Sequence, residues 1–70
     1  MDRKEQEAIL RKNLERSLKL SRMPSKIAEL EFAKYNGVIR GKCKSEAGTP
    51  YKFKCDLKCT VLSVELADND

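Results

Sequence analysis

The sequence predicts an α+β fold in which one long N-terminal amphipathic helix packs on a small antiparallel sheet of three to four strands. Three observations lead to this prediction: a helical apolar stripe near the start of the chain, an Asn-Gly turn between two β-like runs, and strict alternation of apolar and polar residues from Tyr51 to Val61. Side chains of a strand point to opposite faces with a period of two, so this alternation is typical of a strand with one buried face.

Length and charge set broad limits on the protein. Its 70 residues suffice for a single domain with a small core, and a homodimer is one way for so short a chain to gain buried surface. The net charge of +4 favours acidic partners such as nucleic acid or an acidic protein surface. The largest local excess lies in residues 38–60, where six basic residues accompany two acidic ones.

A helix is expected from about residue 2 to about residue 22. Asp2 is placed to cap the first turn through its carboxylate. The leucines of the segment gather on one half of the helical circumference, while lysines and arginines occupy the other half. Glu15 and Lys19 are four residues apart, so we expect them to pair. Pro24 ends the helix, because a proline ring disfavours the helical conformation in the preceding residue.

Residues 26–36 admit two interpretations. Their Ala, Glu, Leu and Lys content favours a helix, yet the apolar face of that helix would include Glu31 and Lys34. Interpreted as a strand, the segment alternates apolar and charged residues on its way to Asn36-Gly37. That dipeptide is a preferred sequence of the two-residue type I′ turn, because both central residues of the turn need positive φ.

The register of this turn supports the strand. A two-residue loop pairs residues whose numbers add to 73, the sum for Asn36 and Gly37. Glu31 then faces Lys42, which is a favourable pair of opposite charges. We therefore predict a hairpin from about residue 28 to about residue 44.

A long bent strand is predicted from about residue 51 to about residue 66. The buried parity changes at Val61-Leu62, which we attribute to a β-bulge. The alternative is a turn at Asp56-Leu57-Lys58 with a shorter strand on each side. The bent strand is preferred because no Gly, Pro or Asn marks that turn. Residues 67–70 form an acidic tail that is expected to fray.

The outward face of the sheet is the predicted binding surface. By strand parity, six basic side chains point away from the helix: Arg40, Lys42, Lys44, Lys52, Lys54 and Lys58. Like charges on neighbouring strands destabilise a sheet unless an anion neutralises them, and lysines and arginines neutralise the phosphates of nucleic acids. A solvated face, charged so that sheet edges do not associate, explains the same pattern without a ligand. Few aromatic residues interleave with these charges, which favours contacts with the nucleic acid backbone over base stacking.

The predicted function is a small non-enzymatic binding module that engages the backbone of DNA or RNA. The alternative is a regulator or inhibitor that docks on the acidic surface of a partner protein, since a compact, charged domain suits either role. An enzyme is not expected, because the sequence has no histidine, no glycine-rich phosphate loop and no nucleophile motif. No cofactor is expected for a module of this kind.

The three cysteines, Cys43, Cys55 and Cys59, are interpreted as small buried core residues. A structural zinc site needs about four ligands with closely spaced cysteine pairs, so no metal site is predicted here. An odd number of thiols argues against a secreted disulfide framework and favours a reducing compartment. The sequence shows no signal-peptide core and no apolar run long enough for a membrane span, so a soluble cytoplasmic protein is expected.

One short segment has a counterpart in a known family. The run YNGVIRG, from Tyr35 to Gly41, is an Asn-Gly turn followed by a strand that contains a glycine, and with the preceding helix it is similar to the opening of Sm-like barrels. The resemblance implies RNA binding. It covers this run and little else, and the remaining chain is short for the five strands of such a barrel.

Overall fold

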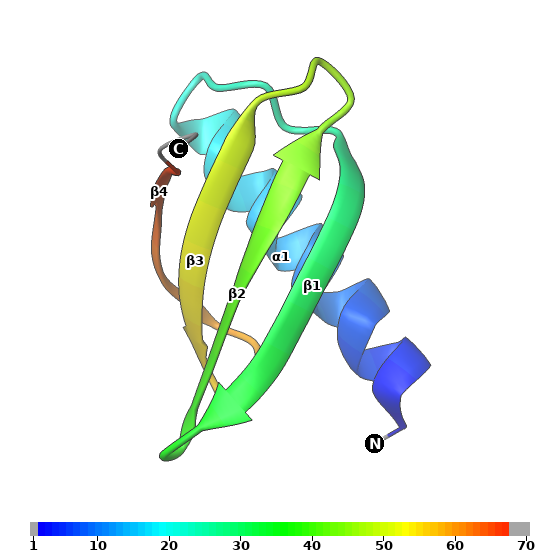
Figure 1. The fold of residues 1–70 in the computed structure, drawn as a ribbon, viewed down its shortest axis with the longest axis vertical. Helices are drawn as coiled ribbons and strands as arrows, with labels where there is room; N and C mark the ends of the chain where they lie inside the picture. The colour runs from blue at the N-terminus through cyan, green and yellow to red at the C-terminus, as the bar shows by residue number, and fades with distance from the viewer. Residues whose placement is uncertain (1, 68–70) are drawn as a thin grey trace.

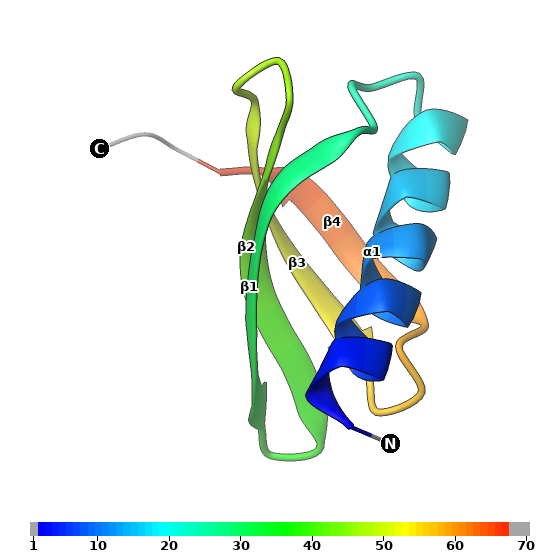
Figure 2. The same cartoon turned by 90° about the vertical axis from the view of Figure 1, so that its right-hand side faces the viewer.

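The computed structural model describes residues 2–67, which form one helix and a four-stranded sheet, as the predicted α+β fold requires. Helix α1 spans Arg3–Leu20, and it is followed by β1 (Ile27–Tyr35), β2 (Val38–Ser45), β3 (Pro50–Asp56) and β4 (Val61–Leu66). Each strand pairs antiparallel with the next, so the sheet order is β1-β2-β3-β4. The helix lies across one face, and no other described element covers the opposite face (Figure 1, Figure 2).

Helix α1 begins at its predicted cap and buries three leucines of its predicted stripe, whereas Leu20 of the same stripe is 79% exposed. The carboxylate of Asp2 accepts a hydrogen bond from the backbone N–H of Glu5 at 3.0 Å. Leu10, Leu14 and Leu18 recur at a spacing of four and are fully buried in the core between helix and sheet. In the described residues no helix combines the length and the apolar character needed to cross a membrane.

Polar contacts join the helix to β1. The carboxylate of Glu15 accepts a hydrogen bond from the N–H of Ile27, the first residue of β1, at 3.1 Å. Glu15 therefore does not form the expected ion pair with Lys19. Arg3 lies over the ring of Phe32, with 4.6 Å between its guanidinium carbon and the ring centroid, and donates to the Phe32 carbonyl at 3.2 Å.

The hairpin of β1 and β2 has the predicted register. Asn36 and Gly37 have positive φ values of 48° and 81°, as a type I′ turn requires. Glu31 pairs with Lys42 in the ladder, as predicted. The residue numbers of every other pair also add to 73, until the register shifts at the first residues of β1. The strand interpretation of residues 26–36 is therefore confirmed.

The chain turns after β3, so the long bent strand predicted over residues 51–66 is wrong. β3 ends at Asp56, and β4 begins after a short loop. The Oδ1 atom of Asp56 accepts hydrogen bonds from the backbone N–H groups of Lys58 and Thr60, at 2.8 and 2.9 Å. This side chain supplies the turn interactions that Gly, Pro or Asn would otherwise signal in the sequence.

The loops on either side of β3 share one backbone pattern. In both Ser45–Thr49 and Asp56–Thr60 the N–H of the first residue donates to the carbonyl of the last, at 2.9 and 3.0 Å. The fourth residue has positive φ in each loop: 88° at Gly48 and 66° at Cys59. Glycine adopts this conformation freely, whereas a residue with a side chain loses about 1–2 kcal/mol.

Contacts with the helix hold Cys59 in this unfavourable conformation. Its carbonyl accepts a hydrogen bond from Nδ2 of Asn13 at 2.7 Å. Its thiol is 1% exposed and lies 4.0 Å from the carbonyl oxygen of Gln6. The loop between β3 and β4 is therefore anchored to α1.

Two predictions from the sequence concern the C-terminal part of the chain: the acidic tail and the likeness to Sm-like barrels. Of the predicted acidic tail, residues 67–70, only Ala67 lies within the described residues, and its N–H donates to the carbonyl of Pro50 at 3.1 Å. The described residues form an open sheet of four strands. The resemblance to Sm-like barrels therefore stops at the turn and the strand after it.

Gly41, in the middle of β2, permits a close approach of three groups. A Cβ atom at this position would collide with the carbonyl oxygen of Glu31, and it would lie 2.8 Å from Cα of Phe32 and 2.8 Å from Cζ of Phe53. Two of these atoms belong to the backbone of β1, so they cannot move away without disturbing the ladder. The absence of a side chain at Gly41 is thus a condition for pairing β1 with β2 in this geometry.

We expect Gly41→Ala to lower the free energy of unfolding by about 1–3 kcal/mol, the usual range for overpacking a well-packed site. Urea titration followed by circular dichroism measures the loss. Gly37→Ala is the comparison variant: open space surrounds Gly37, so its expected loss of about 1–2 kcal/mol comes from the positive φ alone and not from a collision. A Gly41→Ala protein as stable as the unmodified chain would contradict the steric account.

Candidate functional site

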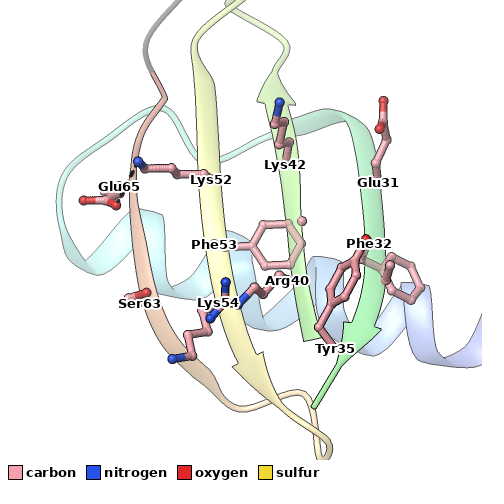
Figure 3. Close-up of a pocket in the computed structure, with 12 residues that line it drawn as sticks. Glu31, Phe32, Tyr35, Arg40, Lys42, Lys52, Phe53, Lys54, Ser63 and Glu65 are labelled. Carbon is pink, nitrogen blue, oxygen red and sulfur yellow. Dashed lines mark ion pairs between the residues drawn. The ribbon is translucent and has the colours of Figure 1, made fainter. Parts of the chain in front are cut away.

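The uncovered face of the sheet carries its side chains in rows that cross the strands. Cα partners across the three ladders define two complete rows. The mixed row, in the order β1 to β4, consists of Glu31, Lys42, Lys52 and Glu65; the cationic row consists of Ala33, Arg40, Lys54 and Ser63. Figure 3 labels these residues, apart from Ala33, on the face turned away from α1.

Carboxylates balance the charge of the mixed row. Nζ of Lys52 lies 3.4 Å from Oε1 of Glu65, and Glu31 is the cross-strand partner of Lys42. Two lysines and two glutamates give this row no net formal charge. Its two lysines are opposed across β2 and β3, but each has an acid on its other side.

The cationic row lacks such compensation. Arg40 and Lys54 are direct cross-strand partners, flanked by Ala33 and Ser63. Neither cation forms an ion pair within the described part of the chain. The acid of the next row, Asp56, engages Oδ1 with two backbone N–H groups of its own loop. Because like charges in directly opposed positions destabilise a sheet, this row holds two positive charges that the fold does not need.

An open hollow of about 550 Å³ lies over both rows. Three aromatic residues help to line it, of which Phe32 and Phe53 are buried and Tyr35 is 59% exposed. Figure 3 shows the ring of Phe53 between the ribbons of β3 and β2. Tyr35 is therefore the aromatic side chain of this lining that is exposed beside the cations.

The structure brings most of the predicted site residues together. Four of them line the hollow: Arg40, Lys42, Lys52 and Lys54. Lys44 is not part of the lining, and its Nζ lies 3.9 Å from a carboxylate oxygen of Glu29. Lys58 was expected on the outward face of a strand, which is wrong, because the turn at Asp56 places it in the loop between β3 and β4.

Sequence reasoning missed Tyr35, Ser63 and Glu65. A signal for Tyr35 was present, since the register of the Asn36-Gly37 turn places it on the same face as Glu31. Ser63 and Glu65 alternate with apolar residues, which places both on one face of a strand but does not say which residues lie beside them. Their positions depend on the ladder between β3 and β4, and that ladder depends on a turn that the sequence does not mark.

The three cysteines belong to the core. All are buried and free, with inward parity for the two on strands, as expected. Burial raises the pKa of Cys43 to about 11 and, with the nearby Cys59 and Asp56, the pKa of Cys55 to about 12. Burial also raises the pKa of Cys59. Thiols in this state are protonated at neutral pH and are poor nucleophiles. Among residues 2–67, no cluster of three or more metal-ligating side chains is formed.

Comparisons with protein-family models, curated proteins and solved structures gave no match to this chain. The chemistry of the cationic row is therefore the guide to its ligand. A guanidinium group such as that of Arg40 presents planar N–H donors that match two phosphate oxygens at once, and an ammonium group such as that of Lys54 acts as a point charge. The row is suited to hold an anion with several oxygens.

We expect Lys54→Glu to raise the free energy of unfolding by about 0.2–1 kcal/mol, because it replaces repulsion from Arg40 with attraction. Urea titration at low salt measures the gain, which shrinks as salt is added. Lys54→Gln removes the repulsion without adding attraction, so its gain is smaller. In an Arg40→Gln background the benefit of Lys54→Glu disappears. A Lys54→Glu protein less stable than the original chain would refute the repulsion.

The cysteine pKa values predict an alkaline loss of stability. The pKa values of Cys43 and Cys55 in the fold lie above their ordinary value of 9.0, so the unfolded chain releases these protons first as the pH rises. The stabilisation is fully present below pH 9 and is lost toward pH 11–12. Denaturation curves between pH 8 and 11 therefore show falling stability. Cys55→Ala lowers the stability at pH 8 but makes the fall shallower, and equal slopes would contradict this account.

Proposed function

We propose that the uncovered face of the sheet binds the phosphate backbone of a nucleic acid, with the cationic row as its centre. The observation that carries the proposal is the direct opposition of Arg40 and Lys54 on an exposed face, in a row without an acid. This pair opposes folding until an anion lies between the two charges. A phosphate group relieves the repulsion, and its binding releases condensed counterions from the nucleic acid.

The lysines of the mixed row extend the surface. The ion pair between Lys52 and Glu65 is more than half exposed on both sides, and exposed ion pairs are worth about 0–1 kcal/mol. Lys52 can therefore exchange its carboxylate for a phosphate at little cost. Lys42 stands beside it at the same level of the sheet.

Edge protection does not account for the placement of these charges. Lysines that keep sheets from associating stand on edge strands. Here the cations that line the hollow stand on the central strands β2 and β3, while the edge strands β1 and β4 contribute acids to this face. This distribution favours a ligand-binding role for the central strands.

Two further expectations accompany the proposal. The buried, reduced state of the three thiols supports a location in the cytoplasm. A homodimer stays a prediction. The regulator that docks on an acidic protein would use the same cations, so the experiment below includes it as an outcome.

The test is a fluorescence anisotropy titration of labelled DNA and RNA oligonucleotides over a range of salt concentrations. We expect the logarithm of the affinity to fall linearly with the logarithm of salt concentration. Arg40→Ala with Lys54→Ala should weaken binding and reduce the magnitude of this slope by about 1.4–1.8, because each lost phosphate contact removes about 0.7–0.9.

Lys12→Ala with Arg16→Ala is the matched control. It removes the same charge from the exposed side of α1, so the slope should stay close to that of the unmodified protein. Equal effects of the two double variants would overturn the proposal. The proposal would also fail if no oligonucleotide bound and the protein instead captured one acidic protein through Arg40 and Lys54. That result would support the regulator.

A further inference from the structure

We infer that the ligand of this face is a single strand of nucleic acid, with its phosphates on Arg40 and Lys54 and a base stacked on Tyr35. The inference rests on the proposed function and specifies its substrate class. It draws on the narrow width of the cationic surface and on the position of the exposed Tyr35.

The cations of the uncovered face form a stripe that runs along β2 and β3 and is only two strands wide. Neighbouring strands lie about 4.8 Å apart, and the uncovered face carries its cations on β2 and β3, with Glu31 on β1 and Glu65 on β4 as flanks. A duplex presents two rows of phosphates separated by a groove about 6 or 12 Å wide. When one row lies on the stripe, the second therefore falls beyond it, toward a flanking glutamate. One phosphate row fits between the flanks without this repulsion.

Tyr35 is placed to receive a base from that strand. It ends β1 on the uncovered face, where Val38 is its direct partner and Arg40 is its diagonal neighbour. Diagonal neighbours in a sheet lie about 7–8 Å apart, within reach of aromatic and long side chains. With 59% of its surface exposed, Tyr35 offers a ring beside the phosphate-binding pair (Figure 3).

Surfaces that bind single strands stack bases on exposed aromatic side chains. Of the three aromatic residues in the lining of the hollow, only Tyr35 is exposed, because Phe32 and Phe53 are buried in the core on the helix side. In a duplex both faces of each base are already stacked, so stacking on Tyr35 is open to single strands.

The test compares three probes of equal length: a single-stranded oligonucleotide, a blunt duplex of the same sequence, and a strand with the same phosphates but abasic sugars. We expect the unmodified protein to prefer the single strand over the duplex by at least tenfold. Tyr35→Ala should weaken binding of the single strand by about tenfold, in line with the loss of one stacked base. Its salt dependence should not change, because no phosphate contact is lost.

Tyr35→Phe is the control variant, since it keeps the stacking ring, and it should bind like the unmodified protein. Tyr35→Ala should leave the weaker binding of the abasic strand unaltered. Circular dichroism of each variant shows that the sheet is intact. Equal affinity for duplex and single strand would overturn the inference, and so would an unaltered affinity of Tyr35→Ala for the single strand. In either case, binding that depends on Arg40 and Lys54 would still support the proposed function. If none of the probes binds, both fail.

Discussion

The two-residue turn at Asn36-Gly37 decides which side chains of the sheet meet the helix and which stay uncovered. A shift of one residue in the register of a strand moves every side chain to the other face. With the observed register, Leu30 and Phe32 join the helix side, while Glu31 and Tyr35 join the uncovered face. The core and the cationic row are therefore consequences of one local choice of backbone conformation.

Much of the fold follows from signals that are local in the sequence. The cap at Asp2 and the spacing of the buried leucines lie within α1, and the hairpin of β1 and β2 follows from one dipeptide and the charges opposed by its register. The turn between β3 and β4 differs because its fourth residue, Cys59, has a conformation that its own type disfavours. Its support comes from Asn13, which lies 46 positions away in the chain. A pattern read along the chain does not contain that contact.

The candidate site was predictable to the same extent. Strand parity identified the uncovered face and the four central cations that line the hollow. It did not divide those cations into a balanced row and an unbalanced one, because that division requires the position of Glu65 and Ser63 on β4. The ladder between β3 and β4 shifts register between Lys54 and Cys55, close to the unmarked turn. Strand parity therefore predicts the face, but it does not predict which two charges on that face lack an acidic partner.

The anchoring of Cys59 to the helix also bears on the order of folding. The first two hairpins have turns with glycine at a left-handed position, so β1, β2 and β3 can pair through local contacts, which form quickly. The third hairpin needs α1 in place before its turn is stabilised. β4 is therefore expected to add last, together with the docking of the helix. Since Ser63 and Glu65 arrive with β4, one flank of the uncovered face is completed only in the final step of folding, and partly folded chains expose the basic strands without it.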